Sequence, residues 1–357
     1  MSLYLAPATA AAAAAVATAA VATFPRRLVL PPSIDIRRHH PELRETMSPP
    51  PPLPPPLLGG SSRRMPAGAK HKAVVVLGAT GTGKTRLAVD LALRFGGEVI
   101  NSDKIQLYAG LDVATNKAGA EERAGVPHHL LGVVPRPDAE FTPADFRREA
   151  RRAADAVTAR GRVPVVAGGS NSYVEALVGD REFGERYECC FLWVDVQLPV
   201  LHGFVGRRVD DMLRRGLLEE VAAAFDRQRM DYSRGIWRAI GVPELDAYLR
   251  CGGEEGERER LLGIAVEEIK SNTRRLSCRQ RGKIQRLARL WAPRVARVDA
   301  TDAFRLRGAA ADQAWDRLVA APCADAVRAF LLHDHRHLAA VQNFNVFAPP
   351  AAAAAVV

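Results

Sequence analysis

The stretch that most constrains the fold of this chain is residues 73–95, AVVVLGATGTGKTRLAVDLALRF. Five apolar residues lead into the turn GATGTGKT, and Leu87, Leu91 and Phe95 then recur at every fourth position, as on one face of a helix. The pattern predicts a buried strand, a glycine-rich turn and an amphipathic helix. The eight-residue motif also occurs as a plain glycine turn, but the strand before it and the helix after it favour phosphate binding.

This turn has the residue types that a phosphate cradle needs. Its glycines carry no Cβ atom, so that backbone N–H groups can converge on an anion at the helix N-terminus. The lysine adds a point charge, and the last threonine hydroxyl can ligate Mg²⁺. The predicted phosphate-binding residues are Gly78, Ala79, Thr80, Gly81, Thr82, Gly83, Lys84 and Thr85, with Thr85 as the Mg²⁺ ligand.

A second strand is predicted at residues 98–103, after the helix stop signal Gly96-Gly97. It ends in Asp103. In open α/β sheets, ligands bind beyond the carboxyl ends of the strands, so we expect Asp103 to face the same crevice as Lys84. The alternative is that Asp103 only caps the next helix.

Two further strands end in polar residues. Residues 163–167 run into GGSNSY, where Ser170 and the backbone could hold an anion, although this short motif is weak by itself. Residues 191–195 end in Asp195, a pattern that often holds Mg²⁺ in phosphate-binding proteins. A cap of the following segment is the alternative for Asp195.

The helical regions complete the predicted fold. TPAD at residues 142–145 is a capping box that opens a helix, and residues 200–215, 217–225 and 254–290 are predicted to be helical. The last of these carries the basic residues Lys270, Arg274, Arg275, Arg279 and Lys283, some of which could close over a diphosphate. We therefore predict an α/β fold of the P-loop NTPase, nucleotide-kinase-like type, a parallel sheet flanked by helices, with a helical second portion.

The ends of the 357-residue chain differ from its centre. Residues 1–70 hold an alanine-rich stretch with early arginines and late acids, then a proline-rich run, which predicts an organelle transit peptide and a linker; simple disordered sequence is the alternative. Residues 8–22 are too weakly apolar for a membrane span. The other expected boundaries are a core at 71–198, a helical acceptor-binding portion at 199–296, a return to the core at 297–340 and a disordered tail at 341–357.

Charge and cysteines add weaker constraints. A formal net charge of +10 suits anionic substrates as well as nucleic acid. The five cysteines form no CxxC pair, which indicates reduced thiols in an intracellular compartment. His333, His335 and His337 alternate, but without a second cluster they are expected to be solvated and not to bind metal.

A phosphate cradle, Mg²⁺ and a nearby carboxylate together indicate group transfer, and two reactions fit. In a small-molecule kinase, Lys84 and Mg²⁺ stabilise a migrating phosphoryl group. In a prenyl transfer, the same cradle holds a diphosphate that leaves while a nucleophile attacks the allylic carbon. A third possibility, from another class, is a nucleotide- or RNA-binding module whose basic helices dominate.

The motifs GATGTGKT, NSDKIQLYAGLDVATNK, PHHLLG, EFTPADF, GGSNSYVEAL, FLWVDV, DYSRGIWRAIGVPELD, EEIKSNT and RVDAT, in this order, resemble those of the plant adenylate isopentenyltransferases, the cytokinin synthases. The resemblance extends over residues 72–332. It implies that the turn at 78–85 grips dimethylallyl diphosphate and that Asp103 is a catalytic base for the adenine N6 amine, with Lys84 as its catalytic partner. It also implies ADP and ATP as acceptors, with AMP poorer, and a plastid location, with cytoplasm or mitochondrion as alternatives.

The resemblance places further residues in family motifs without giving their contacts. These are Lys117, Ser170, Asp195, Arg238 and Lys270. Trp237 stands where relatives usually carry a basic or polar residue. Relatives that prenylate tRNA share the core, and tRNA dimethylallyl transfer is the alternative function; the absence of a CxxC pair favours a free nucleotide. We expect a monomer with Mg²⁺ as cofactor and with no stable nucleic acid or membrane partner.

Overall fold

The computed structural model of the chain describes residues 69–332. The predicted transit peptide and linker, the three alternating histidines and the tail lie outside these residues, except for residues 69 and 70. Within the described residues no helix combines the length and the apolar character needed to cross a membrane. All five cysteines are described, and none forms a disulfide.

A six-stranded, all-parallel sheet forms the centre, in the order β3-β2-β4-β1-β5-β6. Parallel strands need crossover connections, which helices supply here. The strands are β1 (His71–Gly78), β2 (Gly97–Asn101), β3 (His128–His129), β4 (Val163–Ala167), β5 (Tyr187–Asp195) and β6 (Val295–Asp299).

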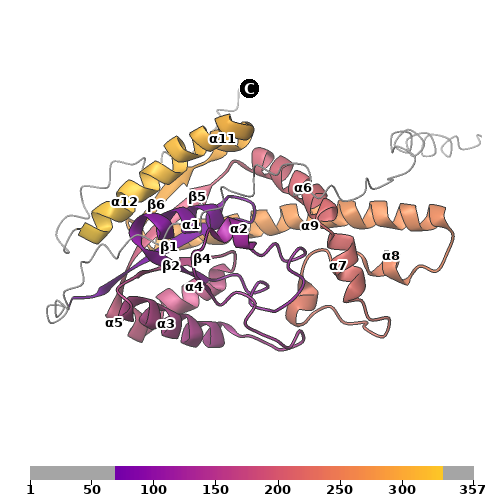
Figure 1. Ribbon diagram of the computed structural model, residues 1–357, viewed down its shortest axis with the longest axis horizontal. Helices are drawn as coiled ribbons and strands as arrows, with labels where there is room; N and C mark the ends of the chain where they lie inside the picture. Colours follow the sequence, from indigo (N-terminus) through magenta and orange to yellow (C-terminus); the bar gives the residue numbers. More distant parts are fainter. Residues whose placement is uncertain (1–68, 333–357) are drawn as a thin grey trace, which may run out of the picture. The chain divides into compact units, whose positions relative to one another are not determined.

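Apolar side chains from both faces of β1 are buried, which explains its continuous apolar run. Ala73, Val75 and Leu77 belong to one buried cluster, whereas Val74 and Val76 belong to another. The first cluster includes residues of α3 (Pro143–Ala159), α4 (Asn171–Val178), α5 (Arg181–Arg186) and α9 (Glu255–Leu290), and the second includes residues of α1 (Lys84–Phe95), α11 (Gly308–Trp315) and α12 (Ala321–Leu332). Helices therefore cover both faces of the sheet, as Figure 1 shows.

The segment between β5 and β6 is helical, as expected. It contains α6 (Leu198–Arg214), α7 (Leu217–Ala223), the short 3₁₀ helix η3 (Gly235–Arg238), α8 (Asp246–Arg250) and α9. In Figure 1, α9 runs from the sheet out past α7 and α8. The remaining elements are α2 (Ala120–Arg123), α10 (Thr301–Arg305) and η4 (Asp316–Ala320), a turn of π-helix before α12.

Several sequence signals act as predicted. The Thr142 hydroxyl accepts a hydrogen bond from the Asp145 amide, and the Asp145 carboxylate accepts one from the Thr142 amide, so that the capping box is complete. Gly96 ends α1 in the left-handed conformation, with φ of 62°. β5 begins earlier than the predicted strand because Tyr187 and Glu188 pair with His71 and Lys72 of β1, although they are not part of an apolar run. β3, α4 and α5 were not predicted.

Candidate active site

The glycine turn between β1 and α1 forms a tight cradle. Gly81 and Gly83 both have φ of 83°, a conformation that side chains with a Cβ atom rarely adopt. A Cβ atom on Gly78 would lie 2.4 Å from the Thr82 Oγ1 atom, so that this close approach also requires glycine. The buried Lys84 side chain folds back over the turn, and its Nζ atom donates a hydrogen bond to the Ala79 carbonyl, 2.7 Å away.

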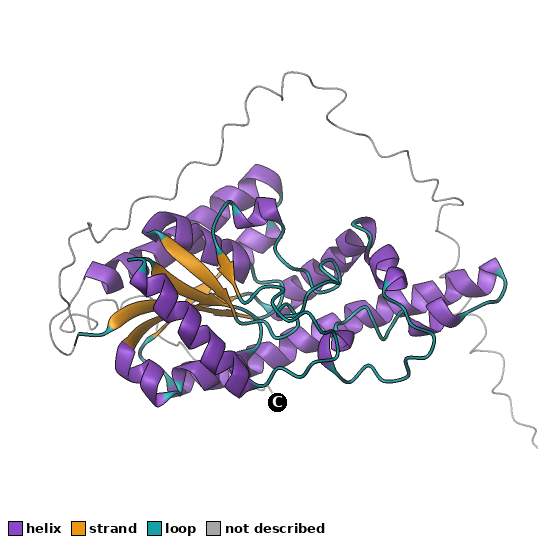
Figure 2. Ribbon diagram, turned by 60° about the horizontal axis from the view of Figure 1, so that its bottom comes forward, coloured by secondary structure: helices purple, strands orange, loops and turns teal. Residues whose placement is uncertain are grey.

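A cavity of about 1260 Å³ opens at the carboxyl ends of the strands. This volume is above the range of roughly 300–1,000 Å³ that is usual for a single small ligand, so there is room for two substrates. Figure 2 shows loops and turns gathered at this end of the strands. The predicted site residues that line the cavity are Thr80, Gly81, Gly83, Lys84, Thr85, Asp103, Ser170 and Arg238.

Asp103 is half-buried and lies just beyond the end of β2. Its Oδ1 atom accepts a hydrogen bond from the Ile105 amide, 3.1 Å away, which fixes the carboxylate without neutralising it. Its Oδ2 atom faces Gly169 in the second glycine turn: a Cβ atom on Gly169 would lie 2.8 Å from this oxygen. The Ser170 hydroxyl in the same turn accepts a hydrogen bond from the Lys104 amide, 2.9 Å away. The second glycine turn and Asp103 thus form one wall of the cavity.

Two cations, the buried Lys84 and the half-buried Arg208, share the electrostatic environment of Asp103. Burial lowers the pKa of Lys84 to about 8, and the Asp103 charge opposes that shift. Burial also lowers the pKa of Arg208, and Asp103 opposes that shift too. Arg208 donates a hydrogen bond from Nη2 to the Thr80 Oγ1 atom, 2.8 Å away, while its buried Nε atom has no partner among the described residues. A carboxylate and two cations therefore face the same space, and the free donor of Arg208 fits an added anion.

Basic side chains from further regions of the chain also line the cavity. Burial lowers the pKa of Lys104, and the charges of Arg238 and Lys283 lower it further, while Asp103 and Glu140 oppose the shift. An excess of positive charge favours an anionic ligand. The lining Lys and Arg residues other than Lys84, Lys104 and Arg208 are Arg86, Arg207, Arg214, Arg215, Arg238, Arg279, Lys283 and Arg307.

Six of the predicted residues do not line the cavity: Gly78, Ala79 and Thr82 of the glycine turn, and Lys117, Asp195 and Lys270. The Lys117 ammonium is buried and donates to the Gly110 carbonyl and the Asp112 carboxylate, so that it stabilises its own loop. Lys270 forms ion pairs with Asp210 and Glu267.

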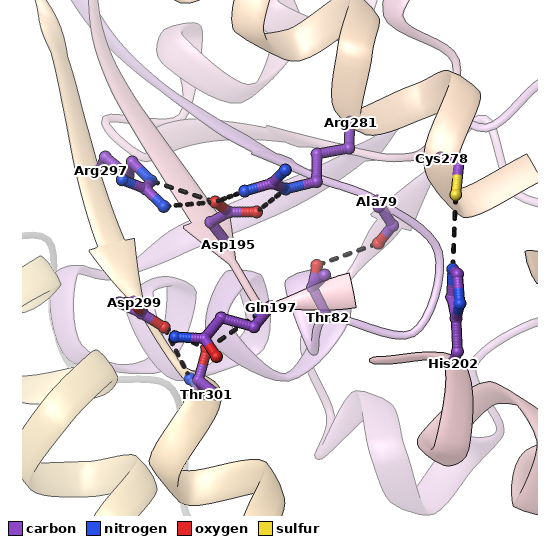
Figure 3. Close-up of polar contacts among 10 residues, drawn as sticks. All are labelled: Ala79, Thr82, Asp195, Gln197, His202, Cys278, Arg281, Arg297, Asp299 and Thr301. Atoms are coloured by element: carbon purple, nitrogen blue, oxygen red, sulfur yellow. Dashed lines mark hydrogen bonds and ion pairs between the residues drawn. The ribbon is translucent and has the colours of Figure 1, made fainter. Parts of the chain in front are cut away.

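The Asp195 side chain caps no helix of the described residues and is held by two arginines. Its carboxylate is 4% exposed and accepts hydrogen bonds from Arg281, at 2.9 and 3.0 Å, and from Arg297, at 3.1 and 2.7 Å (Figure 3). Both carboxylate oxygens therefore already accept hydrogen bonds from guanidinium groups. Both predictions for Asp195, a Mg²⁺ ligand and a cap, are therefore replaced by an ion-pair cluster that joins β5 to α9 and β6.

The residues present fit a magnesium ion held mainly by substrate. Among the described residues, no cluster of three or more His, Cys, Asp or Glu side chains could hold a metal by itself. Mg²⁺ commonly uses one or two protein oxygens together with substrate phosphates. The Thr85 side chain is exposed in the cavity beside Lys84 and is the oxygen that fits this arrangement.

Sequence reasoning missed Arg208 and Gln280, both of which line the cavity. Gln280 is buried in α9 and contacts both glycine turns. Arg208 lay in a predicted helix, and only its contact with the phosphate cradle distinguishes it from its exposed neighbours. A buried glutamine carries no periodic signal that sequence inspection could use.

A curated protein of Arabidopsis thaliana, adenylate isopentenyltransferase 5, chloroplastic, is 54% identical to this chain over 300 residues, which are 80% of this chain and 90% of the relative. The chain belongs to the adenylate isopentenyltransferase family. It is therefore a prenyltransferase. The family model for IPP transferase matches residues 106–184 and 179–286. The adenylate isopentenyltransferase of Humulus lupulus is 44% identical over 295 residues, 72% of this chain and 89% of that one.

Solved structures support the fold of this isopentenyltransferase. A eukaryotic dimethylallyltransferase acting on tRNA superposes with a TM-score of 0.62 at 24% identity, covering 74% of this chain and 80% of that chain. A tRNA isopentenylpyrophosphate transferase from Bacillus halodurans has a TM-score of 0.58 at 26% identity, covering 74% of this chain and all of that chain.

The tryptophan that departs from the family pattern does not line the site. Trp237 is 9% exposed, and the Arg229 guanidinium lies 3.9 Å from its ring centroid. Arg238, the next residue, lines the cavity instead. The tryptophan therefore packs away from the cavity, next to a residue that lines it.

Proposed function

We propose that this isopentenyltransferase transfers the dimethylallyl group of dimethylallyl diphosphate to the N6 amine of adenine in ADP or ATP, and less well in AMP, the first step of cytokinin biosynthesis. The observation that carries the proposal is that the Lys84 cradle and the Asp103 carboxylate open into one cavity large enough for two substrates. The curated relatives named adenylate isopentenyltransferases support the choice of acceptor.

The P-loop side of the cavity holds the donor. Backbone N–H groups at the start of α1 and the Lys84 ammonium bind the diphosphate and stabilise the negative charge that grows as the bond from carbon C1 to the diphosphate oxygen breaks. Mg²⁺, coordinated by Thr85 and the diphosphate, would supply further charge neutralisation.

Asp103 acts on the acceptor. The N6 lone pair of adenine is delocalised into the ring, so that attack on C1 is helped when a carboxylate takes up the N6 proton. The N6–C1 bond then forms, the C1–oxygen bond breaks, diphosphate leaves, and the proton ends on the Asp103 carboxylate. General-base assistance of this kind is typically worth roughly 10²–10⁴-fold in rate.

The acceptor phosphates need positive charge in the cavity. Arg238, Arg279 and Lys283 line the cavity, and their charges suit a di- or triphosphate better than a monophosphate. An anticodon-loop adenosine in tRNA is the second candidate, because solved structures similar to this chain include enzymes named for tRNA.

A competition among acceptors tests the proposal. The purified full chain is incubated with Mg²⁺, dimethylallyl diphosphate and AMP, ADP, ATP or an anticodon-stem-loop RNA, and the N6-prenylated product and released diphosphate are quantified by mass spectrometry. We expect ADP and ATP to react best. Modification of the RNA without modification of ADP would replace the proposal by the tRNA reaction, and no product from any acceptor would refute both.

We also propose that the enzyme acts in plastids. Relatives at 54% identity are named chloroplastic, and one at 52% is named mitochondrial. Residues 1–70 fused to a fluorescent protein should direct it into plastids of plant cells. Accumulation in mitochondria or the cytosol would contradict this location.

A further inference from the structure

One buried side chain of α9 joins the two glycine turns of the active site. The Oε1 atom of Gln280 accepts a hydrogen bond from the Thr80 amide of the P-loop, 2.7 Å away. Its Nε2 atom donates one to the Gly169 carbonyl of the second turn, 2.9 Å away. The side chain is 8% exposed and lines the cavity. A single amide therefore spans the space between the donor cradle and the wall that carries Asp103.

The chemistry of its partners fixes the Gln280 amide in one orientation. A backbone N–H can only donate and a backbone carbonyl can only accept, so that a flipped amide would lose both hydrogen bonds. The Gln280 backbone carbonyl also accepts a hydrogen bond from the Asn171 side chain, 3.2 Å away, at the start of α4. Both the side chain and the backbone of this residue are thus tied to the second glycine turn.

The neighbouring residue anchors α9 along its axis. Arg281 binds the Asp195 carboxylate at the end of β5 through two hydrogen bonds of 2.9 and 3.0 Å. Because β5 pairs with β1, this ion pair fixes the height of α9 relative to the strand that carries the P-loop. Gln280 therefore reaches the cavity from a helix whose position is already set.

The second glycine turn is tightly packed around this contact. A Cβ atom on Gly169 would lie 2.6 Å from the Gln280 Nε2 atom and 2.8 Å from the Asp103 Oδ2 atom. The Gln280 amide and the Asp103 carboxylate hence both approach the Gly169 Cα atom. Displacement of one would change the space available to the other.

We propose that Gln280 is a positioning residue that sets the separation between the diphosphate cradle and the Asp103 carboxylate, and so aligns the acceptor amine with the donor carbon. The inference rests on the proposed prenyl transfer. Alignment of reacting atoms is steeply sensitive to distance, since a misplacement of about 1 Å can cost roughly 10²-fold in rate. The length of the glutamine side chain matches the gap, and no water is needed to bridge it.

Gln280→Met tests this role because methionine preserves the shape of the side chain but makes neither hydrogen bond. We expect kcat for the best acceptor to fall by about 10- to 100-fold. The acceptor KM should stay within about twofold, because the acceptor's other contacts remain, and the donor KM should rise by no more than about fivefold. Rates are expressed per folded molecule, with the folded fraction taken from a denaturant titration.

Arg286→Gln is the matched control. Arg286 lies on α9 and binds Glu175 of α4 at 2.7 Å, so that this variant also removes a contact between α9 and α4, but away from the cavity. We expect kcat and both KM values to be unchanged. A kcat for Gln280→Met equal to that of Arg286→Gln would overturn the proposal, as would a loss explained entirely by a smaller folded fraction.

A readout that does not depend on turnover separates this inference from the proposed function. Amide hydrogen exchange of residues 78–85 should be faster in Gln280→Met than in the wild type, because the Thr80 amide loses its acceptor, while exchange in β5 stays unchanged. If Gln280→Met does not fold, Gln280→Glu replaces it, since it keeps the acceptor for the Thr80 amide but cannot donate to Gly169 when ionised. Unchanged exchange at 78–85 in Gln280→Met would refute the bridge even if the chain proved to act on tRNA.

Discussion

Asp103 and Asp195 occupy equivalent places at the carboxyl edge of the sheet but have opposite environments. Asp103 follows β2 and faces the cavity with one oxygen bound only by the Ile105 amide. Asp195 ends β5, is 4% exposed and is held by two arginines, Arg281 and Arg297. A carboxylate that faces cations across open space can accept a proton. A carboxylate whose oxygens are already hydrogen-bonded to guanidinium groups cannot do so without losing those hydrogen bonds.

The comparison shows that the position of an acid at the end of a strand does not determine its function. Both acids were predicted at the ends of strands, at this edge of the sheet. The role depends on residues that are distant in sequence: Arg281 and Arg297 are 86 and 102 positions away from Asp195. The carboxylate that is not bound by guanidinium groups is the better candidate for chemistry.

Asp103→Asn should give the largest effect. The amide cannot take up the N6 proton, so that we expect kcat to fall by roughly 10²–10⁴-fold. Donor affinity, measured by calorimetry with dimethylallyl diphosphate and Mg²⁺, should be retained, and the melting temperature should change little because Asp103 has no ion pair among the described residues. Wild-type turnover in this variant would remove the distinction between the two carboxylates.

Lys84→Met should give the next largest effect. It removes the charge that binds the leaving diphosphate, so that we expect both donor affinity and kcat to fall, with kcat/KM lower by about 10²–10³-fold. Asp103→Asn lowers kcat alone, and the two variants therefore separate binding from proton transfer. Equal and mild losses in both would contradict the separate roles.

The pKa of Lys84 leads to a prediction about the pH dependence of diphosphate binding. The pKa of Lys84 in the free enzyme is about 8, so that the ammonium is charged below that pH and increasingly neutral above it. A bound diphosphate favours the charged form, and binding above pH 8 must therefore take up a proton. Calorimetry in buffers of different ionisation enthalpy should detect this uptake at pH 9 in the wild type but not in Lys84→Met. The absence of uptake would contradict a lysine in contact with the diphosphate.

The comparison of Asp103 with Asp195 also shows how much of the structure the sequence predicts. The P-loop, the capping box at Thr142 and the parallel order of strand, helix and strand follow from local patterns, and the structure confirms them. The different environments of Asp103 and Asp195 do not follow, because α9 and β6 deliver arginines to Asp195 while Asp103 accepts a hydrogen bond from the nearby Ile105 amide. Gln280 and Arg208 were missed for the same reason. Lys117 and Lys270 lie in family motifs, yet neither lines the cavity, and each is paired with an acid, Asp112 and Asp210 respectively.

Asp195→Asn should affect stability more than catalysis. Removing one partner of a buried ion pair leaves charge without compensation, and the cost is about 3–5 kcal/mol when both partners are fully buried. Here the side chains of Arg281 and Arg297 are 24% and 43% exposed, so that water compensates part of the loss. We expect a decrease of about 1–3 kcal/mol in the free energy of unfolding. The kcat per folded molecule should stay within about threefold of the wild type, because the asparagine oxygen can still accept a hydrogen bond from Arg281 and keep α9 in place. A 10²-fold loss of kcat at unchanged stability would assign Asp195 to the reaction after all.

Arg297→Met should give the smallest effect and should separate the two arginines of the cluster. The Arg297 side chain is the more exposed of the two, and its guanidinium lies over the Trp193 ring, a contact that a methionine side chain can partly replace. We expect a loss of about 0.5–1 kcal/mol in the free energy of unfolding, measured by urea denaturation, and no change in kcat. Arg281→Met should cost more stability and should also lower kcat, because Arg281 fixes the helix that delivers Gln280 to the two glycine turns. If both variants instead lost the same stability and neither changed kcat, the Asp195 cluster would hold the sheet edge together without positioning the active site.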